Sequence, residues 1–342
     1  MHAINTGLIG QKRYAGTLSL FFLFFLATIA ITPLIGSTKI DLGRALSSDL
    51  AFSDNVDANI LFLARVPRII LAALSGAALA VAGAVFQSLL RNDLAAPFTL
   101  GVSSGAALGA VIAMSLGLSY TVAGIPTVPI AAFLGALGAI TLVFSLARTR
   151  TGEFPTSVLL LAGVTANFFF AAMVMLIHYL SDFTQSFRIV RWLMGGLDIT
   201  SYQTLLSISP MIIIGFATLM FISRDLNVIS TGIQSAMSRG VEVIKIQKIG
   251  FVMASLLTGA IVAISGPIGF VGLIVPHIVR LMVGPDLRIL LPASIFFGAS
   301  FLILCDTLAR TIIAPTEIPV GIITAMLGGP FFVWLLKKPK NI

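Results

Sequence analysis

Charged side chains are scarce in this sequence. Lysine, arginine, aspartate and glutamate make up 10% of the 342 residues, whereas a soluble domain carries about 25%. Hydrophobic residues make up 58% of the chain, and its mean hydropathy is +1.06. So few charges cannot cover the surface of a soluble globule of this length. A soluble protein is therefore excluded, and an integral protein of the lipid bilayer is expected.

Cysteine and nucleotide-binding loops are also lacking. Cysteine occurs once, as Cys305 inside an apolar run, so no internal disulfide can form. The dipeptide Gly-Lys never occurs, which excludes the phosphate-binding loop G-x-x-x-x-G-K-[ST]. If ATP drives this protein, another chain must bind it. The sequence offers no cluster of metal-ligating residues either.

Ionisable residues are nearly absent from the middle of the apolar runs, where they would indicate ion coupling. The candidates are His178, His277 and Asp306. Asp306 lies four residues before Arg310, a spacing that favours an ion pair on one helix face over a proton relay. His277 is expected to pack or to hydrogen-bond within a helix bundle.

His178 is the remaining candidate for a transport pathway, together with Met173. The competing interpretation is a helix face near the outer interface, because Tyr179 follows and tyrosine is common there. An ion-coupled secondary transporter needs acidic residues near the middle of the membrane. None is convincingly present, so this class is kept only as the alternative.

Ten apolar runs approach the length of about 20 residues that a transmembrane helix requires. They cover residues 18–36, 67–90, 100–118, 127–147, 157–180, 203–222, 247–264, 267–283, 289–309 and 318–336. The transmembrane domain is thus predicted over 18–336, between an N-terminal segment 1–17 and a tail 337–342. The first run resembles a signal peptide in its basic flank, but it is of membrane length and is expected to remain as the first span.

The charged residues predict how these spans are oriented. With the N-terminus inside, 14 basic residues fall on the cytoplasmic side and 7 outside, whereas 5 acidic residues fall inside and 8 outside. Lysine and arginine are concentrated in the cytoplasmic loops of membrane proteins. Both termini are therefore predicted to be cytoplasmic. The net charge of +8 reflects this topology rather than binding to nucleic acid.

Small residues predict close helix packing and a weak internal repeat. Gly101, Gly105 and Gly109 recur every four residues, so a neighbouring backbone can approach that face. The segments 75–83 and 258–266 share four identities at an offset of 183 residues. They lie in the second and seventh spans, and this odd offset of five spans inverts one half relative to the other, as in many transporters.

The polar loop 224–245, between the sixth and seventh spans, has an apolar pattern of its own. Apolar residues recur at spacings of 3, 4, 4 and 4, namely Leu226, Ile229, Ile233, Met237 and Val241. Gly232 and Gly240 interrupt this stripe, which predicts two short amphipathic helices. Such helices could lie on the membrane surface, but their position between two spans favours insertion into a groove of a cytosolic partner.

Several motifs in the same order are similar to those of the FecCD-type permeases, the membrane subunits of importers for ferric siderophores, haem and vitamin B12. The motifs are Arg65-Val66-Pro67-Arg68, the segments 92–98, 100–106, 160–164 and 266–277, Asp306-Thr307-Leu308-Ala309-Arg310, and Glu317-Ile318-Pro319-Val320-Gly321. The resemblance implies an all-α integral membrane protein with the ten-helix architecture of a type II ATP-binding-cassette (ABC) importer permease.

The resemblance also implies partners. They are a second copy of the chain in a homodimer with the pathway on its two-fold axis, two cytosolic ABC ATPase subunits that bind ATP and magnesium, and a substrate-binding protein on the periplasmic side. The chain itself is expected to bind no cofactor and to catalyse no reaction, and its location would be the bacterial inner membrane. A ferric siderophore is the first choice of cargo, and haem and cobalamin are the alternatives.

Residues at matching positions take on the family's roles as expectations. Arg65, Arg68 and Arg310 would face the periplasm and pair with glutamates of the binding protein. The loop that couples to the ATPase would comprise Leu226, Ile229, Gly232, Ile233, Ala236, Met237, Gly240 and Val241. The cytoplasmic gate would comprise Asn92, Leu94, Thr156 and Ser157.

Three positions depart from the family pattern. Asp93 stands beside the gate where proline is usual. In the coupling loop, Ile233 replaces an acidic residue after the first glycine, and Arg239 replaces a leucine before the second. The gate and the coupling loop are therefore the regions in which this chain differs from the family's pattern.

Overall fold

The computed structural model describes residues 11–47, 52–118, 120–122, 125–147, 155–198 and 201–337. Most of the N-terminal segment 1–17 and nearly all of the tail 337–342 therefore lie outside the described residues. So do several charges used to orient the spans, namely Asp49, Arg148, Arg150, Glu153, Lys338 and Lys340.

Ten helices coincide with the ten predicted spans. They are α1 (Gln11–Ile31), α4 (Val66–Leu90), α5 (Val102–Ser115), α6 (Thr127–Ala147), α7 (Thr156–Leu180), α9 (Tyr202–Phe221), α12 (Val243–Ser265), α13 (Val271–Val283), α14 (Leu287–Thr311) and α15 (Val320–Lys337). Seven helical segments of the described chain are long and apolar enough to cross a membrane, and α5, α13 and α15 are shorter apolar helices. The all-α membrane fold predicted from the sequence is confirmed.

The boundaries of several spans differ from the prediction, and α1 begins seven residues before the predicted first span and ends five residues before its predicted end. The helical segment that contains α4 begins earlier, because α3 (Val56–Asn59) and the π-helix η3 (Ile60–Arg65) precede it without a break. The third span begins with the 3₁₀ helix η4 (Pro97–Leu100). The eighth begins four residues late, because Gly266 and Phe270 both have a positive φ of 65° and the chain between them is not helical. A positive φ interrupts a right-handed helix.

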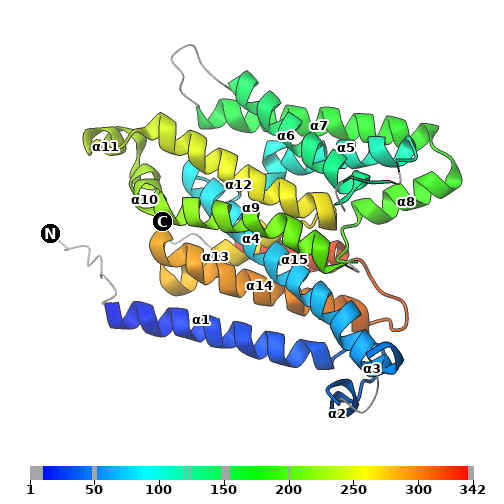
Figure 1. Ribbon diagram of the computed structural model, residues 1–342. Helices are drawn as coiled ribbons and strands as arrows, with labels where there is room; N and C mark the ends of the chain where they lie inside the picture. Colours follow the sequence, from blue (N-terminus) through cyan, green and yellow to red (C-terminus); the bar gives the residue numbers. More distant parts are fainter. Residues whose placement is uncertain are drawn as a thin grey trace.

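Short elements connect the spans at both ends of the bundle. On one side are η1 (Thr32–Leu34), α2 (Leu42–Ala45), η2 (Phe52–Asp54), the hairpin of β1 (Thr121–Val122) and β2 (Ile125–Pro126), and α8 (Phe183–Leu193). On the other side are α10 (Ser223–Thr231) and α11 (Ile233–Ser238). Figure 1 shows α10 and α11 at the left edge of the molecule and α2, α3 and α8 at the right edge, with the long helices between them.

The centre of the bundle is α4, which is buried along most of its length and packs against α12, α13 and α14. Glycines permit these close crossings. An ideal Cβ on Gly76 would lie 2.1 Å from the carbonyl oxygen of Gly298, and one on Gly83 would lie 1.8 Å from that of Gly272. Neither position has room for any side chain, so the backbones themselves are in contact.

The predicted glycine face of the third span is only partly correct. Gly105 and Gly109 do face α6, where their ideal Cβ atoms would lie 2.6 and 2.1 Å from carbonyl oxygens of Gly135 and Ala131. Gly101 precedes the helix, has a positive φ of 77° and faces α7 instead. The four-residue spacing therefore places only Gly105 and Gly109 on one helix face, because α5 begins only at Val102.

Candidate functional site

A cluster of charged residues lies at the end of the bundle that carries α8. Three of its members contact one arginine: the guanidinium of Arg68, at the start of α4, binds carboxylates from three other segments. Its Nη2 lies 2.9 Å from Oδ1 of Asp306, and its Nη1 lies 2.6 Å from Oε2 of Glu317 and 3.5 Å from Oδ1 of Asp198. We call Arg68, Asp198, Asp306, Arg310 and Glu317 the outer charge cluster.

Asp306 connects the two arginines of this cluster. Its Oδ2 accepts a hydrogen bond of 3.1 Å from Nε of Arg310, four residues along α14. The predicted ion pair on one helix face is therefore confirmed. Asp306 is 1% exposed and Arg310 is 5% exposed. A buried carboxylate remains charged at low cost only when it is paired and hydrogen-bonded, and two arginines provide that pairing here.

Arg65 lies at the same end of the bundle but outside the cluster. Its Nη1 donates to the carbonyl oxygen of Pro33 at 2.6 Å, and its Nη2 donates to that of Thr38. The residue is 5% exposed, so its role within the chain is to bind the connection that follows α1. All three predicted docking arginines thus have partners within the chain, and their pairing with glutamates of a binding protein stays a prediction.

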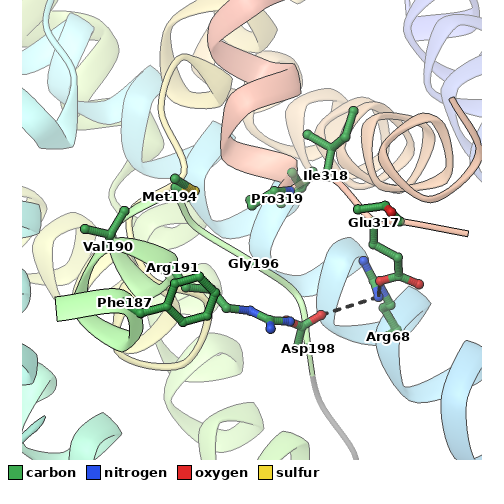
Figure 2. A pocket seen from close by; sticks show the side chains of 12 residues that line it. Arg68, Phe187, Val190, Arg191, Met194, Gly196, Asp198, Glu317, Ile318 and Pro319 are labelled. Atoms are coloured by element: carbon green, nitrogen blue, oxygen red, sulfur yellow. Dashed lines mark hydrogen bonds and ion pairs between the residues drawn. The ribbon is translucent and has the colours of Figure 1, made fainter. Parts of the chain in front are cut away.

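A cavity of about 450 Å³ opens beside Arg68. Figure 2 shows its apolar walls, formed by Phe187, Val190 and Met194 on one side and by Ile318 and Pro319 on the other. Arg191, Asp198 and Glu317 line its rim, with their side chains 66%, 58% and 41% exposed. The rim of the cavity therefore offers exposed charges of both signs beside the buried pair of Arg68 and Asp306.

The helix α8 that forms one wall of this cavity was missed by the sequence analysis. Asp182 caps it by accepting a hydrogen bond of 2.8 Å from the backbone nitrogen of Gln185. Its exposed residues Phe187 and Arg191 lie four positions apart on one face, and the buried Ile189 lies on the opposite face, as in an amphipathic helix. The charge of this short segment hid it from a search for long apolar runs.

The predicted coupling loop forms the two short helices that the sequence indicated. Gly232 separates α10 from α11 with a φ of 141°, and Gly240 follows α11 with a φ of 80°. Leu226 and Ile229, both in α10, are fully buried. Glycine tolerates such positive φ values because it has no Cβ.

Beyond Gly232 the predicted apolar stripe is only partly correct, because Ile233 and Val241 pack against the core whereas Met237 does not. In α11 the fully buried residue is Ala236, whereas Met237 is 46% exposed, and Ile233 and Val241 are half-buried. The turn at Gly232 changes the direction of the chain, so the periodicity of α10 does not continue into α11. The role of this loop in ATPase coupling stays a prediction.

The predicted gate residues lie in two places at the cytoplasmic end of the predicted topology. Asn92 follows the end of α4 and accepts a hydrogen bond of 2.9 Å from the backbone nitrogen of Leu94, which is 53% exposed. Thr156 and Ser157 begin α7, and Ser157 is exposed. The helix η4 joins the two regions, because it follows Leu94 and packs against α7. Their action as a gate stays a prediction.

Asp93, which departs from the family pattern, has a specific partner. Its Oδ1 forms an ion pair with Nη1 of Arg280 in α13. Nη2 of Arg280 donates to Oε1 of Gln87 at 2.9 Å, and Gln87 is buried in α4. The residue that replaces proline therefore links the loop after α4 to α13, a contact that the sequence analysis missed.

The three histidine and methionine candidates do not form a common site. Met173 and His178 are half-buried on α7, and Nε2 of His178 has no hydrogen-bond partner within the described part of the chain. His277 packs edge-on against Phe331, with ring centroids 5.9 Å apart. Its predicted packing role is thus observed, while a pathway role for Met173 and His178 stays a prediction.

Comparison with known proteins gives relatives among the permeases of import and transport systems. The chain is 44% identical to the cobalamin import system permease BtuC of Halobacterium salinarum over 277 residues, which cover 80% of this chain and 72% of that protein. It is 41% identical to the hemin transport system permease HmuU of Yersinia pestis over 279 residues, which cover 81% of this chain and 83% of that protein.

A solved structure supports the same relationship. It is described as an inward-facing conformation of a metal-chelate type ABC transporter, and it matches 95% of this chain and all of its own with a TM-score of 0.81 and 32% identity. The model of the FecCD transport family matches residues 21–338, which include nine of the spanning helices in full and the second half of α1. The chain therefore belongs to the FecCD transport family.

Proposed function

We propose that this chain is the permease subunit of an ABC importer that moves a metal chelate from the periplasm to the cytoplasm. The observation that carries the proposal is the arrangement of two candidate partner surfaces at opposite ends of one ten-helix bundle. The outer charge cluster and its cavity lie beside α8, and Figure 1 shows α8 and the α10–α11 pair at opposite ends of the molecule.

Each surface fits a different partner. The outer charge cluster contains arginines suited to carboxylates of a binding protein, because guanidinium groups bind carboxylates in a fixed geometry. The α10–α11 pair would insert into a cytosolic ATPase, which binds ATP and magnesium on its own chain. A second copy of the permease would complete the pathway. The protein would lie in a bacterial inner membrane, with both termini on the cytoplasmic side.

Transport would proceed by alternating access. ATP binding and hydrolysis favour different conformations of the ATPases, and α10 and α11 transmit that difference to the permease. A ligand shifts such an equilibrium only by the difference in its free energy of interaction with the two states. The residues of this chain would bind partners and shape the pathway, and the chain would perform no bond chemistry.

The proposed cargo is a preformed chelate, with a ferric siderophore as the first choice. The described residues contain no group of three or more histidine, cysteine, aspartate or glutamate side chains that could hold a metal ion. A chelate presents its organic shell to the protein, so such a group is not required. Two relatives are named for cobalamin and hemin, and these remain the competing cargoes.

The test is reconstitution of the chain in liposomes with an ABC ATPase and a binding protein encoded beside it. The ATPase rate is measured with the binding protein empty and loaded with a ferric siderophore, haem or cobalamin. Stimulation by one loaded form supports the proposal and identifies the cargo. Uptake that follows an ion gradient, without a co-purifying ATPase, would contradict it and favour a secondary transporter.

A further inference from the structure

The side chain of Asn227, on α10, reaches the first turn of α14. Its Nδ2 donates to Oδ1 of Asp286 at 2.7 Å, and its Oδ1 accepts from the backbone nitrogen of Leu287 at 2.8 Å. Both ends of the carboxamide are therefore used. This pair of bonds admits one orientation of the side chain relative to α14.

These bonds complete the N-terminal cap of α14. The first backbone N–H groups of a helix have no acceptor within the helix itself. Asp286 accepts the N–H of Arg288 at 3.0 Å, and Asn227 accepts the N–H of Leu287. Displacing α10 from α14 would leave that second N–H without its acceptor. The cap thus couples the positions of the two helices.

The other contacts of α10 hold it against the bundle. Leu226 and Ile229 are fully buried, and Leu226 lies close to Gly250 of α12. The neighbouring α11, by contrast, exposes Met237. Asn227 is therefore placed between a surface available to a partner and the helices of the membrane domain.

The far end of α14 carries the outer charge cluster. The helix has 25 residues, which corresponds to about 37 Å at 1.5 Å per residue. Asp306, near its last turn, binds Arg68 and Arg310. In Figure 1, α14 extends from the side of α10 toward the side of α3. One helix therefore contacts the coupling loop at one end and the arginines at the other.

We propose that Asn227 is a positioning residue for energy coupling. It clamps α10 to the start of α14, so that a displacement of the α10–α11 pair moves α14 and, through Asp306, the arginines of the outer charge cluster. This inference rests on the proposed function, because the displacement would come from a bound ATPase. It assigns to α14 the connection between the two partner surfaces.

The experiment uses the full chain reconstituted with its ATPase and binding protein. Three variants test the clamp: Asn227→Leu removes both hydrogen bonds at similar volume, Asn227→Asp opposes two carboxylates, and Asn227→Asp combined with Asp286→Asn restores a donor and an acceptor with polarity reversed. Ser145→Ala, on the exposed face of α6 and outside both partner surfaces, is the control, because its hydroxyl donates to the carbonyl oxygen of Leu142 in the same helix. The readout is the ratio of ATPase rates with loaded binding protein and without it.

We expect this ratio to fall at least about fivefold in Asn227→Leu and Asn227→Asp, since couplings between sites typically amount to 5- to 150-fold. The basal rate should change by less than about twofold, and the double variant should recover most of the ratio. A purely structural role would instead reduce basal and stimulated rates together and leave the ratio unchanged.

Two other outcomes overturn the inference for different reasons. A wild-type chain that is stimulated, together with an equally stimulated Asn227→Leu variant, would refute the clamp and leave the proposed function intact. A wild-type chain that no loaded binding protein stimulates would contradict the proposed function, and the clamp would fall with it.

Discussion

At the scale of single residues, the three outer arginines differ in ways that their sequence motifs do not reveal. Arg65 binds backbone carbonyls, Arg310 binds a buried aspartate, and Arg68 binds three carboxylates that differ widely in exposure. The same charge therefore stabilises a connection in one case and remains near a solvent-accessible cavity in another. Substitutions at the three positions should have different consequences.

Replacement of Arg65 should reduce stability before it affects docking. Hydrogen bonds to charged groups contribute about 1.5–3 kcal/mol each, so Arg65→Gln should lower the free energy of unfolding by about 2 kcal/mol or more. Thermal unfolding in detergent measures the loss. Arg44→Gln, at an exposed arginine on the same side, is the control. An equally stable Arg65→Gln variant with weaker docking would show that Arg65 acts only on the partner.

Replacement of Glu317 should strengthen binding of the binding protein. Glu317 occupies Nη1 of Arg68 at 2.6 Å, so it competes with any carboxylate that a partner presents. A partly exposed ion pair is worth about 0.2–1 kcal/mol, which predicts a gain in affinity of about 1.5- to 5-fold in Glu317→Gln. The dissociation constant is measured with immobilised binding protein.

The control for that gain is Asp57→Asn, which removes the same charge from the same side of the molecule, outside the outer charge cluster. It should change the affinity less than Glu317→Gln does. Combining Glu317→Gln with Arg68→Gln should abolish the gain in affinity, because the guanidinium for which Glu317 and the partner compete is then absent. Weaker binding in Glu317→Gln would mean that Glu317 itself contacts the partner.

At the scale of helices, glycines determine how closely α4 approaches its neighbours. Gly83→Ala would place a Cβ 1.8 Å from a backbone oxygen of α13, and overpacking of this kind costs about 1–3 kcal/mol or more. Gly138→Ala, in α6, meets nothing within 4 Å and should be neutral or slightly stabilising. Thermal unfolding of both variants compares them. Equal stability would mean that α4 and α13 can separate without cost.

The first turn of α14 should make stability depend on pH. The hydrogen bond from Arg288 is the main cause that lowers the pKa of Asp286 below its ordinary value of 3.8. The carboxylate of Asp286 therefore takes up a proton at a higher pH in the unfolded chain than in the folded one. Its contribution to the free energy of unfolding is complete above pH 3.8 and is lost as the pH falls through the lowered pKa. Unfolding of wild type and Asp286→Asn between neutral and acidic pH measures the difference. The two curves should converge at low pH, and parallel curves would contradict this.

At the scale of the whole molecule, the predicted orientation assigns α10 to the cytoplasm and α8 to the periplasm. Single cysteines at Ser230 and Thr184, in a Cys305→Ala background, test this because both positions are exposed. Ser230→Cys should react with an impermeant thiol reagent only in inside-out vesicles, and Thr184→Cys only in right-side-out vesicles. Labelling of both from the same side would overturn the charge-based topology.

The sequence by itself determined the membrane class, the ten spans and the helix pair after α9. These follow from local properties: apolar runs of membrane length, basic loops, and glycines at 232 and 240 that interrupt an apolar pattern. Local composition identifies such features because a bilayer excludes charge and requires helices to satisfy their own backbone hydrogen bonds. The amphipathic α8 escaped because its charge and short length resemble those of a loop.

Only the tertiary structure decided which charges pair across different segments of the chain. Arg68 meets Asp198, Asp306 and Glu317 across 130, 238 and 249 residues of sequence, and Asn227 meets Asp286 across 59. No periodicity encodes these separations, because they depend on how the helices cross. The close crossings of α4 with α13 and α14 bring the segments together, so the partners of Arg68 became visible only in the folded chain.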